Sequence, residues 1–534
     1  MLLTPGSLEL PTLCGIGFGG GQCLSVADYV TMRGPRIGRP PPEGASVASL
    51  RGAATHFSAS TETGTSPVNE GWPLPAKTRN EFMIRCTKRA PRCIARTFSP
   101  RARSAIVIAI AFVLTGCATN HLMMPTPVLY TGANARPLFT HLSSDGRRPS
   151  LDLLFITDRA PADQAGDLPY TAGRSRSMAF GSAIIEFGED VSWDVLVKES
   201  TATQRVNPLR LKLGATTELG RFPAMPYEVT VAPDGIRRAP AVVEAHEKAK
   251  QQLQAEIARR LAIARRKEVV LFVHGYRSSF ASAALTMGKL CHFLGREFVC
   301  GIFTWPAGGR RGILFGYDID RESSEYAIED LLKAIRIVAR TPGVERLHLI
   351  AHSRGTDTLT SALAALSAEA YALQSSPDRE FHIGNVVLVA PDIDGDVALT
   401  KIFKVFSDPD LPFGGKPDPG AIMPPSPGLR VTLYVSPDDK ALGAARWLFG
   451  SIVRLGRIDA TILSADQIEA IALLQAVDII QVSGTSDFFG HGYFISNPHA
   501  SADIIALLRY GLRPNEPGRP LEHIAGPFWR VPAQ

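Results

Sequence analysis

The sequence predicts a doubly wound α/β fold with a mostly parallel sheet, preceded by a small β-rich segment. From residue 268 onward, short apolar runs alternate with stretches of helical periodicity, as expected when helices connect parallel strands. The runs are almost entirely apolar, which is typical of strands buried on both faces of a sheet. One run ends in a sharp turn centred on a serine, and a helical pattern follows at once.

The first 116 residues differ from the rest of the chain. Residues 1–82 are rich in Gly, Pro, Ser and Arg and lack an apolar period, which predicts disordered chain or sequence upstream of the true start. Residues 83–116 combine a basic stretch, the apolar run 105–114 and small residues at the end. This pattern is typical of a secretory signal, because a membrane span needs roughly 20 apolar residues.

Positive charge is concentrated in this leading region. Residues 1–116 hold 13 of the 57 Lys and Arg side chains and only 6 of the 51 Asp and Glu side chains. The rest of the chain is therefore close to neutral, and no nucleic-acid partner is expected. The cysteines show no metal-ligand spacing, and the sequence predicts neither a metal nor a cofactor.

The end of the signal, Leu114-Thr115-Gly116-Cys117, resembles the lipobox of bacterial lipoproteins. The resemblance implies that Cys117 becomes the lipidated first residue of the mature protein, which would be held in the cell envelope. Ala118 in place of Asp favours the outer membrane of a Gram-negative host, facing the periplasm. Acyl chains contribute roughly 0.8 kcal/mol per buried CH₂, so several of them anchor a protein without a spanning helix. An ordinary anchoring segment is the alternative.

Five parts are predicted after the signal. They are a tether at 117–150, a β-rich segment at 151–240 with strands at 151–157, 177–187 and 193–197, a connector helix at 241–266, an α/β domain at 267–512 and a Pro-rich tail at 513–534. The connector helix follows from apolar residues at helical spacing among charged ones.

Within the α/β domain, strands and helices are predicted in alternation. The strands are 269–273, 298–304, 346–351, 386–390, 431–435 and 479–482, and the helices are 280–294, 323–340, 356–370 and a helical region around 441–455. Residues 407–428 contain seven prolines and four glycines. A loop of this length can cover a site that lies at the strand ends.

Ser353 is the candidate nucleophile. It lies in Ala351-His352-Ser353-Arg354-Gly355, which matches the motif G-x-S-x-G except that Ala351 replaces the first glycine. Such a strained turn between strand and helix exposes the central side chain and needs small neighbours. A plain strand-to-helix turn would fit the same five residues, so the motif needs support from the rest of the chain.

A serine hydroxyl needs a base to remove its proton and an acid to orient that base. When a hydrolase is built on this type of sheet, the chain order is serine, acid, histidine. His491 is the preferred base, because glycines on both sides allow a tight or mobile loop. His499 is the weaker choice, and His348 and His352 are expected to belong to the packed strand and turn.

Four aspartates are candidates for the orienting acid. Asp439 is preferred and Asp438 is second, since both follow the predicted strand 431–435. Asp392 and Asp394 follow the preceding strand and are the fallback. Turn formation or helix capping would explain each of these aspartates equally well.

An acyl-transfer reaction also needs N–H donors for the negatively charged oxygen of the tetrahedral intermediate. One is the backbone N–H of Arg354, directly after the nucleophile, and the other comes from the loop after the first strand of the domain. There Gly275 allows close approach of the backbone, so that Tyr276 and Gly275 are the candidates. A strand end that requires glycine would look the same.

Several blocks in the right order carry a family resemblance. They are Phe272-Val-His-Gly-Tyr276, Ser279-Phe280, Thr304-Trp305-Pro306, Tyr317 with Asp318 and Asp320, Leu349-Ile-Ala-His-Ser-Arg-Gly355, Ala390-Pro-Asp-Ile-Asp394, Tyr434-Val-Ser436 with Asp439-Lys-Ala-Leu442, and Gly490-His491. Over residues 268–510 the chain resembles an esterase/lipase-like family of bacterial α/β-hydrolases whose function is largely uncharacterised. The upstream Ile156-Thr-Asp-Arg159 looks like the leading strand of that family. The resemblance implies the fold and a catalytic triad, but no substrate.

Two positions depart from the family pattern. Arg354 stands where Met is usual, which places a long cation beside the nucleophile, and Gly492 stands where Ser is usual. The leading hypothesis is an envelope-anchored serine hydrolase that cleaves a small-molecule or lipid ester, or a thioester, with Ser353, His491 and Asp439. A non-catalytic envelope binding or scaffold protein with the same fold is the alternative, and a peptidase is a third hypothesis. Cys291 and Cys300 fit a disulfide or two buried thiols.

Overall fold

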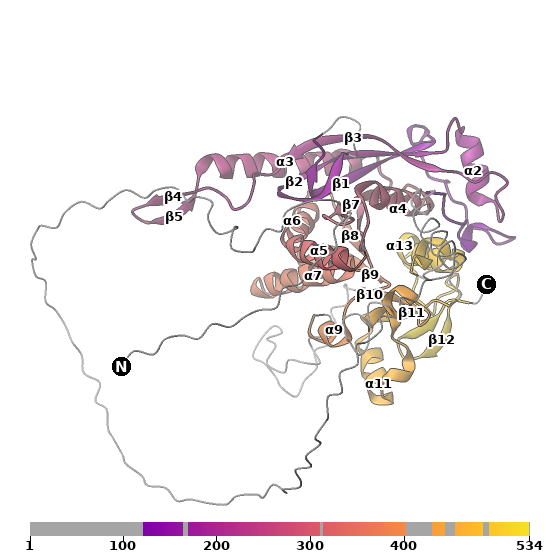
Figure 1. Cartoon of the computed structure of the whole chain (residues 1–534). Helices are drawn as coiled ribbons and strands as arrows, with labels where there is room; N and C mark the ends of the chain where they lie inside the picture. Colours follow the sequence, from indigo (N-terminus) through magenta and orange to yellow (C-terminus); the bar gives the residue numbers. More distant parts are fainter. Residues whose placement is uncertain are drawn as a thin grey trace, which may run out of the picture. The chain divides into compact units, whose positions relative to one another are not determined.

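An eleven-stranded sheet forms the centre of the computed structural model, which describes residues 121–163, 169–309, 313–401, 430–443, 454–483 and 491–532 (Figure 1). In order across the sheet, the strands are β12 (Glu522–Ala525), β13 (Phe528–Arg530), β11 (Val477–Gln481), β10 (Arg430–Val435), β9 (Ile383–Val389), β8 (Arg346–His352), β6 (Glu268–Val273), β7 (Val299–Thr304), β1 (Ser150–Pro161), β2 (Tyr170–Phe187) and β3 (Leu211–Arg221). A separate hairpin consists of β4 (Val229–Ala232) and β5 (Gly235–Arg238).

The eight consecutive strands from β13 to β1 in this order all run parallel to one another. Strands β12, β2 and β3 pair in antiparallel fashion at the two ends of the sheet. Because the parallel strands point the same way, the sheet has an amino edge, where they begin, and a carboxyl edge, where they end. The predicted doubly wound, mostly parallel α/β sheet is confirmed.

Each face of the sheet packs against its own apolar core. In β6, Val269, Leu271 and Val273 belong to one core, whereas Val270 and Phe272 belong to the other. The first core includes residues of α3 (Pro240–Ile263), α6 (Ile328–Ala339) and α7 (Gly355–Ala372), and the second includes residues of α4 (Phe280–Phe293) and α13 (Pro498–Tyr510). Helices on both faces explain why the predicted strands are continuously apolar.

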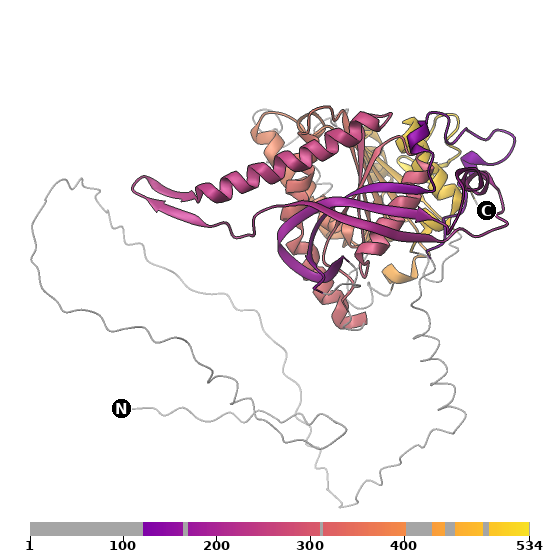
Figure 2. The same ribbon diagram turned by 90° about the horizontal axis from the view of Figure 1, so that it is seen from above.

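The other described helices connect strands or lie near their ends. They are α2 (Trp193–Thr201), α5 (Ile313–Tyr326), α8 (Pro377–Glu380), α9 (Gly395–Lys401), α11 (Ala465–Leu474) and α12 (Tyr493–Ser496), with 3-10 turns η2 (Val128–Tyr130), η3 (Ser144–Gly146), η5 (Leu455–Arg457) and η6 (Ala460–Ile462). The helix predicted at 323–340 is divided between α5 and α6 at Ala327. Figure 2 shows the β4–β5 hairpin extending beyond the start of α3.

The β-rich segment belongs to the main sheet. Its strand β1 pairs in parallel with β7, from Leu154 opposite Gly301 to Thr157 opposite Thr304. The predicted strands at 151–157 and 177–187 therefore continue the sheet of the α/β domain rather than stand before it. The strand predicted at 193–197 is wrong, because these residues begin α2, whose N-cap Ser192 accepts a hydrogen bond from the Val195 N–H. Capping and the burial of Leu196 and Ser200, four residues apart, outweigh the β-branched composition.

The tether and the tail are also more structured than predicted. Of the expected tether, residues 121–150 pack against the domain and bury Met123, Met124, Tyr130 and Leu138. Of the expected tail, β13 pairs in parallel with β11. Both segments contain short apolar runs that only the tertiary structure covers, and neither shows a period long enough to predict an element.

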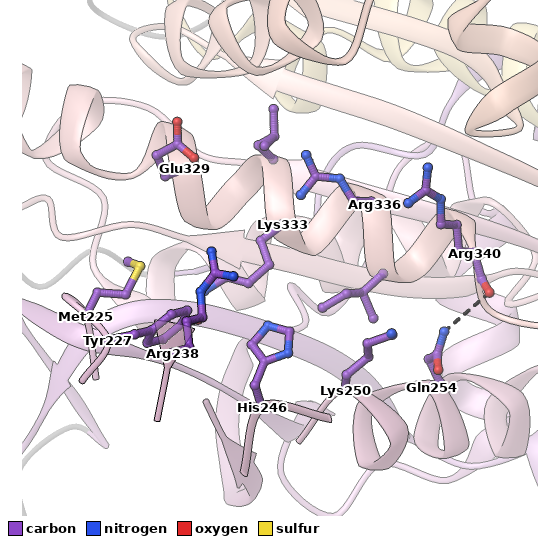
Figure 3. A pocket seen from close by; sticks show the side chains of 12 residues that line it. Met225, Tyr227, Arg238, His246, Lys250, Gln254, Glu329, Lys333, Arg336 and Arg340 are labelled. Carbon is purple, nitrogen blue, oxygen red and sulfur yellow. Dashed lines mark hydrogen bonds between the residues drawn. The ribbon is translucent and has the colours of Figure 1, made fainter. Parts of the chain in front are cut away.

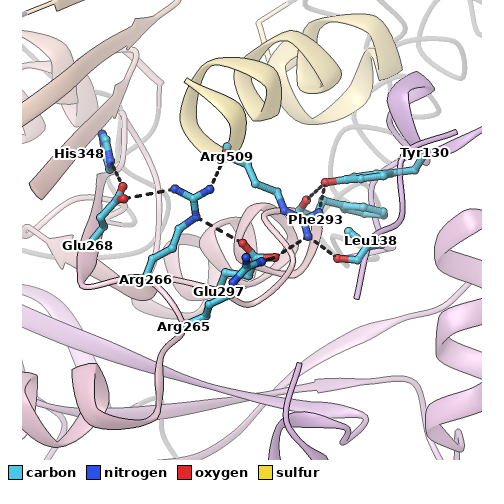
Figure 4. A network of polar contacts seen from close by, with 9 residues as sticks. All are labelled: Tyr130, Leu138, Arg265, Arg266, Glu268, Phe293, Glu297, His348 and Arg509. Carbon is cyan, nitrogen blue, oxygen red and sulfur yellow. Dashed lines mark hydrogen bonds and ion pairs between the residues drawn. The ribbon is translucent and has the colours of Figure 1, made fainter. Parts of the chain in front are cut away.

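A buried network fastens the segment around η2 to the amino edge of the sheet (Figure 4). The guanidinium of Arg509, at the end of α13, donates to the Tyr130 hydroxyl at 2.8 Å, to the Leu138 carbonyl at 2.7 Å and to the Glu297 carboxylate at 2.7 Å. Glu297 also pairs with Arg266, at 3.3 Å. Because Arg266 and Glu297 lie two residues before the starts of β6 and β7, the first described residues are held where the parallel strands begin.

Several predictions concern residues outside the described ranges. These are the leader 1–82, the signal 83–116, the lipidation site Cys117, the loop 407–428, Gly490 and most of the helical region around 441–455. In the part of the chain that the structure describes, no helix is both long and apolar enough to cross a membrane.

The structure joins Cys291 at the end of α4 to Cys300 in β7 by a disulfide, with the two Cα atoms 6.1 Å apart. The bond closes a segment with a sequence separation of nine residues. Of the two alternatives that the sequence left open, the disulfide is therefore the one that this structure contains.

Removing this disulfide is expected to destabilise the domain. The loop-entropy relation gives about 2.5 kcal/mol for a cross-link of this span, because the unfolded chain regains freedom. Chemical denaturation of wild type and of Cys291→Ser/Cys300→Ser measures the difference in unfolding free energy. Thiol labelling of the unfolded, unreduced protein, read out on the peptides that contain Cys291 and Cys300, is the control, and two reactive thiols at these positions would contradict the assignment.

Candidate active site

The nucleophile elbow lies where β8 meets α7. Strand β8 ends at His352, Ser353 has φ of +53°, and α7 begins at Gly355. A left-handed conformation is costly for a residue with a side chain, and it persists only when surrounding contacts impose it. Here the Ser353 N–H donates to the Val389 carbonyl of β9 at 2.9 Å. The predicted strained turn is present, and Ser353 remains 5% exposed.

Two glycines allow the elbow to touch the loop after β6. A Cβ atom on Gly355 would lie 2.2 Å from the His274 carbonyl oxygen, and one on Gly275 would lie 2.6 Å from the Ser353 Cβ. Neither distance is possible between non-bonded atoms, so both positions require glycine. The loop that was predicted to supply oxyanion donors, at Gly275 and Tyr276, is therefore in direct contact with the serine turn.

His491 and Asp439 form a hydrogen-bonded pair. The Nδ1 atom of His491 lies 2.7 Å from Oδ2 of Asp439, whose side chain is fully buried. The other carboxylate oxygen of Asp439 accepts the Leu442 N–H at 2.9 Å. Because a carboxylate accepts, Nδ1 carries the proton, and Nε2 of a neutral His491 is left with a lone pair.

His352 connects this pair to the elbow. Its Nε2 atom lies 3.1 Å from the His491 carbonyl oxygen, so Nε2 carries the proton and donates it. The rings of His352 and His491 are 4.9 Å apart, and Phe494 packs against His352 at 5.0 Å. The imidazole of His491 is thus held beside the residue that directly precedes Ser353.

The remaining candidate acids are occupied differently. Asp438 is exposed to solvent, next to the buried Asp439. Asp392 accepts the Tyr317 hydroxyl at 2.7 Å and pairs with Arg454 at 3.4 Å. Asp394 accepts the Asp396 N–H at 3.0 Å, at the start of α9. Of the four aspartates, the structure joins His491 to Asp439.

The other histidines lie elsewhere. His348 sits near the beginning of β8, at the amino edge, where Nε2 is 2.8 Å from a Glu268 carboxylate oxygen. His499 is the second residue of α13, and burial lowers its pKa. The prediction that His348 and His352 pack within the strand and turn agrees with their positions.

The positive charge of the Arg354 side chain is paired with nearby carboxylates. Its guanidinium pairs with Asp357 at 2.7 Å and with Glu325 at 3.5 Å, and it donates to the Ser324 hydroxyl at 3.2 Å. The side chain is only 7% exposed. The long cation expected beside the nucleophile is therefore present, but carboxylates of helices α5 and α7 neutralise its charge.

Arg159 is a buried residue to which the sequence assigned no role. Its guanidinium donates to the carbonyl oxygens of Ser278 at 2.6 Å, Ala307 at 3.0 Å and Thr171 at 3.1 Å, and to the Thr304 hydroxyl at 2.8 Å. Burial lowers the pKa of Arg159 to about 10, so the group stays charged at neutral pH. One side chain from β1 therefore holds the loops that follow β6 and β7.

His274 lies beside Arg159 and links the same two loops, with its Nε2 atom 3.2 Å from an Arg159 nitrogen. The Trp305 N–H donates to His274 Nε2 at 3.1 Å, so the proton is on Nδ1, which lies 3.0 Å from the Gly275 carbonyl oxygen. Burial, followed by the charge of Arg159, lowers the pKa of His274 well below its usual value. A neutral His274 thereby fixes the peptide unit between Gly275 and Tyr276, whose N–H is the candidate oxyanion donor. The sequence signal for the loop-holding role of Arg159 was the segment Ile156-Thr-Asp-Arg159, which the family resemblance identified only as a leading strand.

A pocket of about 390 Å³ lies between α3 and α6, and none of the predicted site residues lines it (Figure 3). Several cations line it, and carboxylates pair with at least two of them: Lys250 with Glu247 at 3.1 Å and Lys333 with Asp330 at 2.7 Å. Among the described residues, no group of three or more His, Cys, Asp or Glu is arranged to hold a metal ion.

Asp439→Asn is expected to reduce kcat/KM for an activated ester roughly a thousandfold or more, because the imidazole loses its orienting negative charge. Asp438→Asn is the matched control, since it makes the same change at the adjacent exposed position. Steady-state hydrolysis of a p-nitrophenyl ester measures both. Equal losses in the two variants, or a loss confined to Asp438→Asn, would contradict the choice of acid.

His352 is expected to make stability depend on pH. Burial, followed by the charge of His491, lowers the pKa of His352 from 6.5 to about 3. Below pH 6.5 the unfolded chain binds a proton that the folded protein does not, so stability is lost as the pH falls towards 3. At pH 5 the loss is about 2 kcal/mol. His352→Gln keeps an N–H donor but does not titrate.

Denaturant unfolding of wild type and His352→Gln at pH 7.5 and pH 5 tests this dependence. Taking the difference between the two proteins cancels the contributions of all other titrating groups. The difference in unfolding free energy should shift by about 2 kcal/mol in favour of the variant at pH 5. A difference that is the same at both pH values would mean that His352 titrates normally.

Residues 249–509 match the model of a family described as an alpha/beta hydrolase of unknown function (DUF900). No protein of curated function matches the chain. The matched residues extend from α3 to α13 and contain the elbow, the loop after β6 and the His491–Asp439 pair. The match, which covers just under half of the chain, supports an alpha/beta-hydrolase domain of unknown function at residues 249–509.

Proposed function

We propose that this protein is a serine hydrolase that cleaves a carboxylic ester or thioester with Ser353, His491 and Asp439. The observation that carries the proposal is the His491–Asp439 pair, held by His352 directly beside the strained turn of Ser353. A histidine hydrogen-bonded to a buried carboxylate at a nucleophile elbow is the arrangement that activates a serine hydroxyl.

In the proposed mechanism, the Ser353 Oγ atom attacks the carbonyl carbon of the substrate while Nε2 of His491 takes the hydroxyl proton. The negative charge that develops on the substrate oxygen is stabilised by the backbone N–H groups of Arg354 and Tyr276. Collapse of the tetrahedral intermediate breaks the ester bond, and His491 gives its proton to the leaving alcohol or thiol.

The resulting acyl group on Ser353 is removed by water. His491 takes a proton from this water, the hydroxide adds to the acyl carbon, and the proton returns to Oγ as the carboxylic acid leaves. Throughout, Asp439 stabilises the imidazolium form of His491 without being protonated itself. Arg159 and His274 support the cycle indirectly, since they hold the loop that presents the Tyr276 N–H.

We further propose that Cys117 anchors the mature protein by acyl chains in the cell envelope, facing the periplasm if the membrane is the outer one. The lipobox-like sequence and the basic, apolar segment before it support this localisation. The membrane partner would then be contacted through the lipidated cysteine.

A fluorophosphonate probe tests the proposed chemistry, because it reacts covalently with an activated serine. Wild type is expected to be labelled, and Ser353→Ala is expected to lose the label completely. His491→Ala should reduce labelling strongly, and Ser436→Ala, another buried serine near a strand end, is the control that should keep it. Wild-type protein that stays unlabelled, or is labelled as fast as Ser353→Ala, would favour the non-catalytic binding or scaffold hypothesis.

A further inference from the structure

The described chain begins at the amino edge of the sheet. The Leu211 N–H, at the start of β3, donates to the His121 carbonyl at 2.8 Å, and the Met123 N–H donates to the Leu209 carbonyl at 2.8 Å. Leu211 pairs with Phe187, whose N–H donates to the carbonyl of Pro149, just before β1. His121 is therefore level with the beginning of the parallel strands.

The proposed catalytic residues lie at the opposite edge. Tyr276 follows β6, Ser353 follows β8, Asp439 follows β10 and His491 follows β11. Strands β6 and β8 contain six and seven residues. At a rise of about 3.3 Å per residue, they separate the two edges by roughly 20 Å.

The proposed anchor segment between Cys117 and His121 is too short to let the carboxyl edge of the sheet face the bilayer. Cys117 precedes His121 by four residues, and a fully extended chain of that length spans about 14 Å. Residues 121–150 add no further reach, because they are packed into the domain. A bilayer that holds the acyl chains of Cys117 therefore lies close to the amino edge.

The exposed side chains near His121 suit a membrane surface. Leu122 is 40% exposed and Val206 is 84% exposed, so both present apolar groups. Arg210, which bridges to Leu122, and Lys212 carry exposed positive charge. Glu186 lies opposite Lys212, and Glu189 and Asp190 shortly after β2 are exposed, so this edge carries mixed charge, and its apolar groups are what favours contact with a phospholipid surface.

We propose that the anchored domain stands with its amino edge against the membrane, so that the Ser353 site opens away from it and acts on water-soluble esters rather than on lipids of the same bilayer. This inference rests on the proposed hydrolase function and on the proposed anchor at Cys117. It narrows the substrate class, since an ester must reach the carboxyl edge from the aqueous side. Even a domain tilted onto its side keeps that edge from facing the bilayer.

Orientation is tested with a fluorophore on single engineered thiols. Lys212→Cys labels the amino edge and Val397→Cys, in α9, labels the carboxyl edge, and both positions are exposed. In the mature protein Cys117 is acylated and Cys291 and Cys300 are joined, so the new thiol is the one that reacts. The lipidated protein is bound to phosphatidylethanolamine/phosphatidylglycerol vesicles that carry a headgroup quencher.

Strong quenching at position 212 and little at position 397 supports the proposal. Equal quenching, or stronger quenching at position 397, overturns it. Cys117→Ser is the control and should abolish vesicle binding and quenching together. If the wild-type protein fails to bind the vesicles, the proposed anchor and the proposed orientation are both overturned, whatever the enzymatic activity.

The substrate consequence is tested on the same vesicles. Lipidated wild type should hydrolyse water-soluble p-nitrophenyl butyrate as fast as Cys117→Ser does, while leaving the vesicle phospholipid intact. A variant with about 20 Gly and Ser residues inserted between Asn120 and His121 gains a reach of roughly 25 Å. It should keep the rate on the soluble ester, because the insertion is far from the site.

The outcomes separate the two proposals. Cleavage of the vesicle phospholipid by wild type at a rate comparable to the soluble ester overturns the proposed orientation and leaves the hydrolase function intact. Lack of hydrolysis of either ester, together with no fluorophosphonate labelling, overturns the hydrolase function, while the quenching measurement still decides the orientation. Ser353→Ala is the blank for both esters.

Discussion

The buried guanidinium of Arg159 is the contact on which the candidate site depends. It ties strand β1 to the loops that follow β6 and β7, and it lies beside the neutral ring of His274. Because each of its donors has a partner, the charge remains tolerable in the interior. Each hydrogen bond to a charged group of this kind contributes about 1.5–3 kcal/mol, so the several bonds of Arg159 together hold the loops firmly. A loop that must present an N–H group to a short-lived oxyanion benefits from this rigidity.

The second constraint is the close approach of the elbow and the loop after β6. Ser353 adopts a strained left-handed conformation, and Gly275 and Gly355 leave no space for a side chain between the two segments. Parallel strands bring these segments together, since β6 and β8 are neighbours and end at the same edge. The same topology places Asp439 after β10 and His491 after β11. The sheet thus assembles a site from residues that are distant in the sequence, and it also fixes which way that site faces relative to the start of the described chain.

Burial decides between side chains that look equivalent in the sequence. Asp438 and Asp439 are adjacent, yet one is exposed and the other is fully buried against His491. Arg354 stands beside the nucleophile, yet Asp357 and Glu325 neutralise it. His491 and Glu325 come from distant elements, so local sequence carries no information about these two contacts, whereas Asp357 lies only three residues after Arg354. The charges available for catalysis at the carboxyl edge are therefore those that neighbouring side chains leave unneutralised.

The sequence by itself determined the parallel α/β sheet, the serine turn and the chain order of serine, acid and histidine, because apolar periodicity and glycine spacing are local signals of strand, helix and turn. Tertiary structure alone decided that the β-rich segment joins the main sheet, that residues 121–150 are packed rather than a tether, and that Arg159 clamps the loop after β6. It also decided that 193–197 begin a helix and that Cys291 and Cys300 are joined. These outcomes arise from contacts between distant segments, whose energies exceed the weak local preferences of short runs.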